Sequence, residues 1–80
     1  MELKYIDMRG QVCPATLISA LREINSHKDA IKAETLKLVF ITSNRDSTVT
    51  IPKSAENMGY ATKVSEEDAS YRIEIFAAGL

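Results

Sequence analysis

The spacing of apolar and polar residues predicts a strand and then a helix in the first third of the chain. Residues 3–8 mix β-favouring with polar side chains and run into Gly10, which predicts a short strand that ends in a turn. Pro14 favours the first position of a helix, because its missing N–H has no partner there in any case and its φ is already helical. The apolar side chains that follow recur with helical period: Leu17, Leu21 and Ile24, flanked by Ile18 and Ala20. We therefore expect a helix from Pro14 to about Ser26, with Cys13 next to its first residue.

The middle of the chain predicts a central strand and a second helix. Residues 27–34 are mostly polar and lead into residues 36–42, whose nearly continuous apolar character is typical of a central strand. Residues 43–47 are rich in side chains that favour turns and helix caps. The second helix is expected to open near Ile51-Pro52 and to end at Gly59. Its apolar face is formed by Ile51, Ala55 and Met58.

The last third predicts a hairpin of two strands. Residues 60–65 and 71–76 have strand character, and residues 66–70 form the polar loop between them. The complete order is β-α-β-α-β-β, and the fold class is α+β. We expect a two-layer α/β sandwich in which two helices lie on one face of a four-stranded mixed sheet, with residues 1–80 forming a single domain.

Composition and charge exclude several classes of protein. The chain has 45% hydrophobic and 26% charged residues and a net charge of −1, which is typical of an ordinary globular domain. Acidic and basic residues are interspersed, so direct binding of nucleic acid is not expected. The longest apolar run, residues 38–41, is far shorter than the roughly 18 residues of a membrane span. Residues 1–20 also lack the pattern of a signal peptide, so we expect a cytoplasmic protein without a membrane partner.

Cys13 is the candidate for chemistry. The chain has one cysteine and one histidine, too few for an internal disulfide or a zinc site built from these residues, so no metal and no cofactor are expected. At a helix start, the positive end of the helix dipole favours the thiolate form. Gly10 allows a tight turn near the thiol, and Arg9 adds positive charge. The alternative interpretation is that Cys13 is a small buried apolar residue without a reaction.

Two other polar residues have structural interpretations. Asp7, at the end of the first strand, either caps a turn or orients the loop that carries Cys13. His27 lies at the far end of the first helix, roughly 20 Å from Cys13 at the helical rise, and is expected to interact with that helix end rather than act as a base for the thiol.

The motif Asp7-x-Arg9-Gly10-x-x-Cys13-Pro14, followed by Ile51-Pro52 and Gly59, resembles that of the TusA (SirA-like) family of sulfur carriers. The resemblance extends over almost the whole chain. It implies that Cys13 accepts sulfur as a persulfide from a cysteine desulfurase or rhodanese-like donor and passes it to a downstream acceptor protein. It also implies a sulfurtransferase-like carrier rather than a stand-alone enzyme.

Three residues depart from the family pattern. Thr16 stands where a second proline is usual, Asn44 where an acidic residue often follows the second strand, and Thr50 where an aspartate is common. We expect these residues near the active face, where they affect the choice of partner.

Two other functions remain open at this point. One is a regulatory or protein-binding module of the same fold in which Cys13 carries nothing. The other, less favoured, is nucleic-acid binding through the sheet face.

Overall fold

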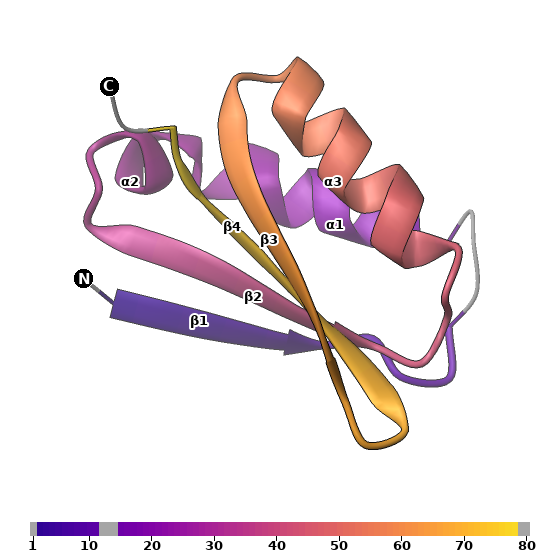
Figure 1. Cartoon of the computed structure of the whole chain (residues 1–80). Helices are drawn as coiled ribbons and strands as arrows, with labels where there is room; N and C mark the ends of the chain where they lie inside the picture. Colours follow the sequence, from indigo (N-terminus) through magenta and orange to yellow (C-terminus); the bar gives the residue numbers. More distant parts are fainter. Residues whose placement is uncertain (1, 12–14, 79–80) are drawn as a thin grey trace.

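A computed structural model of the chain describes residues 2–11 and 15–78. Cys13 and Pro14 lie outside the described residues. The elements, in chain order, are β1 (Glu2–Asp7), α1 (Ala15–Ser26), α2 (Lys28–Lys32), β2 (Leu36–Thr42), α3 (Ser47–Asn57), β3 (Tyr60–Glu67) and β4 (Ser70–Ala77). One sheet contains the four strands, and the helices pack against one of its faces (Figure 1).

The sheet is mixed and has the strand order β1-β2-β4-β3. β1 and β2 are parallel, with Glu2 opposite Leu36 and Asp7 opposite Ile41. β4 pairs antiparallel with β2 on one side and with β3 on the other. This architecture confirms the predicted fold class, a two-layer arrangement of helices on a four-stranded mixed sheet.

The core lies between the sheet and the helices. Alternate residues of a strand point to the same face, so every second residue of β2 and β4 faces the helices. The fully buried side chains on this face of the sheet are Leu38, Phe40, Ile73 and Ile75, and those of the helices are Ala20, Ile24, Ile31, Ile51 and Ala55. Met8, which is 1% exposed, closes the core at the end of β1, as expected for a methionine that fills a gap.

The connection between α1 and β2 differs from the prediction. Residues 27–34 contain the short helix α2, which the mostly polar sequence does not indicate. Its only buried side chain is Ile31, and the backbone N–H of Ile31 donates to the carbonyl of His27 at 3.0 Å. A single apolar residue has no periodicity, so the helix was not recognisable from the pattern.

The start of α3 was also predicted wrongly. The helix begins at Ser47 rather than near Ile51, so Pro52 lies inside it. The hydroxyls of Thr48 and Thr50 donate to the carbonyls of Arg45 and Asp46, at 2.6 and 3.3 Å. These bonds give both hydroxyls acceptors within the first turn of the helix. The predicted apolar face is nevertheless correct, because Ile51 and Ala55 are buried and Met58 packs against the core.

The hairpin between β3 and β4 is tighter than predicted. Glu67 pairs with Ser70, so the loop contains only Asp68 and Ala69 instead of five residues. Asp68 has φ 40°, a conformation that two-residue hairpin loops require and that aspartate tolerates.

Candidate functional site

The starts of α1 and α3 lie together at one end of the sheet, beyond the C-terminal ends of β1 and β2. The two strands are parallel, so both end on this side, and each is followed by a loop and a helix (Figure 1). Thr16, the second residue of α1, and Ser47, the first residue of α3, are both fully buried. Their hydroxyl oxygens are 2.6 Å apart and form a hydrogen bond in which either group can donate. This bond joins the first turns of the two helices.

The turn that follows β1 is anchored at several points. The N–H of Met8 donates to the carbonyl of Ile41 at 2.7 Å, and the N–H of Gln11 donates to the carbonyl of Met8 at 3.1 Å. Between them, Gly10 has φ +89°, a conformation that only glycine adopts without strain. The N–H of Gly10 donates to the hydroxyl of Ser43 at 3.3 Å, so the loop after β1 is bonded to the loop after β2.

Asp7 and Arg9 form a bidentate ion pair within this turn. One carboxylate oxygen, Oδ1, accepts from the backbone N–H and from Nε of Arg9, both at 3.0 Å. The other, Oδ2, accepts from Nη2 at 2.8 Å. The hydrogen bonds from the Arg9 side chain and backbone lower the pKa of Asp7 to about 2, and the same carboxylate raises the pKa of Arg9. Asp7 therefore bonds the backbone of the turn, and the pair presents little net charge.

Of the five predicted site residues, Asp7, Arg9 and Gly10 share this one turn. Cys13 and Pro14 lie outside the described residues, so their predicted roles stay predictions. The predicted motif did not include Ser43 and Ser47, whose hydroxyls tie the two loops and the two helices together. Ser47 had a sequence signal, because it lies four residues before Ile51 and eight before Ala55, on the buried face of the same helix.

Thr16, the first of the departures from the family pattern, lies in the first turn of α1 and has a fully buried side chain. The fully buried residues of α1 are Thr16, Ala20 and Ile24, at four-residue spacing, whereas Leu17 and Leu21 are only partly buried. The threonine is therefore part of the packing between α1 and α3, and its hydroxyl bonds to Ser47 of α3.

Asn44 and Thr50, the other two departures, are partly buried residues around the start of α3. The side-chain oxygen of Asn44 accepts from the backbone N–H of Asp46 at 2.9 Å. The backbone N–H of Asn44 donates to the Thr42 hydroxyl at 3.0 Å. Asn44 thus shapes the turn between β2 and α3 without contributing a charge.

His27 lies at the end of α1, as predicted. Its Nδ1 is 3.0 Å from the carbonyl oxygen of Glu23, and its Nε2 is 3.1 Å from Nζ of Lys4. Since lysine only donates, Nε2 accepts and Nδ1 carries the proton that bonds the helix carbonyl. His27 is a structural residue that links the helix end to β1.

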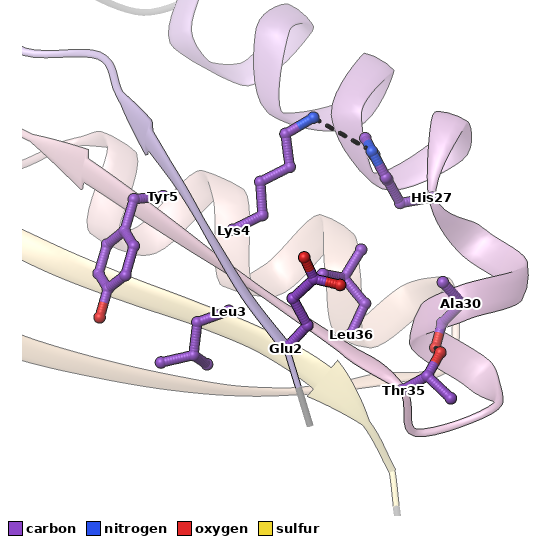
Figure 2. Close-up of a pocket in the computed structure, with 8 residues that line it drawn as sticks. All are labelled: Glu2, Leu3, Lys4, Tyr5, His27, Ala30, Thr35 and Leu36. Atoms are coloured by element: carbon purple, nitrogen blue, oxygen red, sulfur yellow. Dashed lines mark hydrogen bonds between the residues drawn. The ribbon is translucent and has the colours of Figure 1, made fainter.

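His27 also lines a hollow of about 540 Å³ along the first half of β1. Figure 2 shows this hollow with Lys4 and His27 on one side and Tyr5 on the other. Its residues do not include Asp7, Arg9 or Gly10, so the hollow is separate from the candidate site.

The open face of the sheet carries a compensated charge network. Glu74 is 8% exposed and forms ion pairs with Lys37 and with Arg72, whose Nε lies 3.3 Å from its carboxylate. The guanidinium of Arg72 lies over the Tyr5 ring, 5.4 Å from the centroid. Hydrogen bonding from Lys37 lowers the pKa of Glu74 despite its burial. Arg72 also lies 4.0 Å from a carboxylate oxygen of Glu67, so the two cations face two carboxylates. Paired cations are less available to phosphates, which does not favour the nucleic-acid alternative.

Within residues 2–11 and 15–78, no three metal-binding side chains gather at one place. In the same part of the chain, none of the helices combines the length and apolar character of a membrane span.

The fold and the joined helix starts define a small two-layer α/β protein with its candidate site on the loop before α1. The family described as Sulfurtransferase TusA matches residues 4–76, and the chain belongs to this family. The crystal structure of a SirA-like protein from Desulfitobacterium hafniense is similar, with a TM-score of 0.80 and 28% sequence identity. The match covers 96% of this chain and 99% of that one. No curated protein matches the chain.

Proposed function

We propose that the protein is a sulfur carrier that holds a persulfide on Cys13. Its family is named for sulfur transfer, and Cys13 is the one cysteine of the sequence. The observation that carries the proposal is the bond between Thr16 and Ser47. Thr16 lies three residues after Cys13 in the chain, and the bond joins the start of its helix to the start of α3.

The electrostatics of this end of the sheet support a thiolate. The first turn of α1 has no acidic residue, so no carboxylate in that turn offsets the positive end of the α1 dipole. A thiol at such a position ionises more readily and becomes a better nucleophile. Arg9 adds little to this effect, since its charge is paired with Asp7.

The transfer step balances without another reactant. The Cys13 thiolate attacks the outer sulfur of a persulfide on the donor protein, and the S–S bond of the donor breaks. The donor cysteine leaves as a thiolate, and the transferred sulfur keeps its proton, so that Cys13 holds it as Cys13–S–SH. The acceptor protein then repeats the same exchange with this outer sulfur.

The partners follow from this chemistry. The donor is a protein that forms a cysteine persulfide, of the desulfurase or rhodanese-like class, and the acceptor is a second protein thiol or enzyme. A cytoplasmic location remains a prediction from the sequence.

Intact-mass spectrometry after incubation with a cysteine desulfurase and cysteine tests the proposal. We expect the native chain to gain one sulfur atom that a reductant removes, and Cys13→Ser to gain none. If the native chain gains no sulfur while its thiol still reacts with an alkylating reagent, the protein is better described as a regulatory or binding module of the same fold.

A further inference from the structure

The outer surface of the helix layer has the same pattern of exposed residues on α1 and on α3. Residues four and seven positions apart lie on one face of a helix, and in both helices three exposed residues follow this spacing. They are Ile18, Arg22 and Asn25 in α1, and Val49, Lys53 and Glu56 in α3. The opposite faces of both helices contribute to the core, so these residues lie on the side away from the sheet. We call Ile18, Arg22, Val49 and Lys53 the outer helix face.

The bond between Thr16 and Ser47 places the two halves of the outer helix face level with each other. In α1 the apolar Ile18 and the cation Arg22 come two and six residues after Thr16, and the apolar residue and the cation of α3 have the same offsets from Ser47. Both helices run from this end of the sheet toward the opposite end (Figure 1). At the helical rise, the apolar residues lie about 3 Å and the cations about 9 Å beyond the bond. The outer helix face therefore has an apolar row near the candidate site and a cationic row about one turn farther.

The apolar row is open to solvent. Ile18 is 56% exposed and Val49 is 66% exposed. A single exposed apolar residue is common on a protein surface, whereas two at the same level on neighbouring helices are typical of a contact surface. Ala15, the first residue of α1, is also exposed and follows Cys13 by two positions in the chain. The apolar row thus belongs to the same end of the helix layer as the residue that carries sulfur in the proposed function.

The cations of the outer helix face have no carboxylate partner. None of the ion pairs within residues 2–11 and 15–78 includes Arg22 or Lys53, and both side chains are exposed. The acidic residues of the two helices are bonded elsewhere, because Glu23 lies 3.8 Å from a lysine of β1 and Glu56 accepts from a threonine hydroxyl of β3 at 2.8 Å. The exposed residues 45–46 have opposite charges. The outer helix face therefore has a net positive charge.

We propose that the outer helix face binds the sulfur donor protein, through a donor surface that combines carboxylates with an apolar area. The inference rests on the proposed function: the donor persulfide has to reach Cys13, so the donor also meets the adjoining start of α1. Charge complementarity selects an acidic surface, because Arg22 and Lys53 are the unpaired charges there. A second copy of the same face fits worse, since it would bring cations against cations.

The rate of sulfur loading tests this surface. The initial rate at which the full chain gains sulfur from a cysteine desulfurase and cysteine is measured by intact mass, at a chain concentration low enough for the rate to be proportional to it. We expect the double variant Arg22→Glu, Lys53→Glu to load about tenfold more slowly than the native chain at low salt, and the difference to shrink as salt screens the charges. The double variant Ile18→Gln, Val49→Gln is expected to load more slowly at every salt concentration, because its loss is not electrostatic.

Two controls separate binding of the donor from other effects. The double variant Lys28→Glu, Lys63→Glu makes the same change in net charge at exposed positions of α2 and β3, and it is expected to load like the native chain. Iodoacetamide is a small neutral reagent that needs no docking surface. Its rate of reaction with Cys13 is expected to differ by less than about twofold among all these proteins, which shows that the variants are folded and keep the thiol intact.

The outcomes distinguish this inference from the proposed function. A native chain that gains no sulfur contradicts the proposed function, and the inference is then also wrong. If both variants of the outer helix face load at the native rate, or if the control pair is slowed as much, the inference is overturned while the proposed function stands. Native loading that is independent of salt overturns the acidic character of the donor surface. A native chain that sediments as a dimer, together with a monomeric Ile18→Gln, Val49→Gln variant, would assign the face to a second copy instead.

Discussion

The hydroxyl oxygens of Thr16 and Ser47 lie 2.6 Å apart in the fully buried contact between α1 and α3. Two hydroxyl groups in the core are costly unless they bond, and this pair bonds across 31 residues of sequence. Since each residue belongs to the first turn of its helix, the bond fixes the two helix starts relative to one another.

Removing one of these hydroxyls is expected to lower stability. Thr16→Val keeps the shape of the side chain but leaves the Ser47 hydroxyl without this partner, and we expect a loss of about 1–3 kcal/mol in the free energy of unfolding. Ser47→Ala should have a similar effect, and the double variant should lose less than the sum. Urea unfolding of the four proteins measures the coupling, and strictly additive losses would show that the hydrogen bond contributes nothing.

The Asp7–Arg9 pair predicts opposite effects of two neutralising changes on the Cys13 thiol. Asp7→Asn leaves the guanidinium charge uncompensated and favours the thiolate, whereas Arg9→Gln leaves the carboxylate charge and disfavours it. Because both groups are exposed and screened, we expect the pH midpoint of alkylation to fall and rise by about 0.3 units, respectively. The double variant should match the native chain. Shifts in the same direction for both single variants would contradict this electrostatic account.

Gly10 and Gly59 form a matched pair for testing the turn. Both have positive φ, +89° and +94°, and a Cβ at either position would meet no atom within 4 Å. Replacement by alanine therefore costs only backbone strain, about 1–2 kcal/mol at each position in chemical unfolding. Only Gly10→Ala is expected to change the rate of Cys13 alkylation, since Gly59 follows the far end of α3. Equal effects on alkylation would mean that the thiol responds to overall stability rather than to this turn.

Glu74 predicts a loss of stability in acid. Because hydrogen bonding from Lys37 lowers the pKa of Glu74 below its usual 4.5 in the folded chain, its contribution is complete above that pH and disappears as the pH falls further. Glu74→Gln is expected to cost about 1–2 kcal/mol at pH 7 and to make unfolding less dependent on pH below about 4.5. Urea unfolding at several pH values, with the exposed Glu66→Gln as control, measures this difference. An unchanged pH dependence in Glu74→Gln would assign the acid sensitivity to other groups.

The sequence predicted the sheet and the main helices because their patterns are periodic. Leu36–Thr42 is nearly continuous in apolar residues, and Ile73 and Ile75 alternate with charged residues, so the central strands were recognisable. The start of α3 was not recognisable from the sequence, because Pro52 is typical of a first helical position and the residues before it have low helix propensity. Ser47, the first residue of the helix, is fully buried, a tertiary feature that the local sequence does not indicate.

The candidate site was predicted in part. Local sequence was sufficient for Asp7, Arg9 and Gly10, because a turn cap and a positive φ involve residues two or three apart. The bonding partners of Ser43 and Ser47 lie 33 and 31 positions away, and no local pattern identifies them. The same holds for Thr16, whose partner lies on another helix. The spacing of Ser47 from Ile51 indicates only that it lies on the buried face of its helix.

The bond between Gly10 and Ser43 also has a consequence for how the chain folds. Its two residues meet only after β1 has aligned with β2, which closes a loop of more than 30 residues and is slow compared with forming α1 alone. The turn before Cys13 is therefore among the last parts of the chain to reach its final form. If Cys13 carries sulfur as proposed, a nascent or partly folded molecule, which lacks the Gly10–Ser43 bond, is expected to be loaded more slowly than the folded chain.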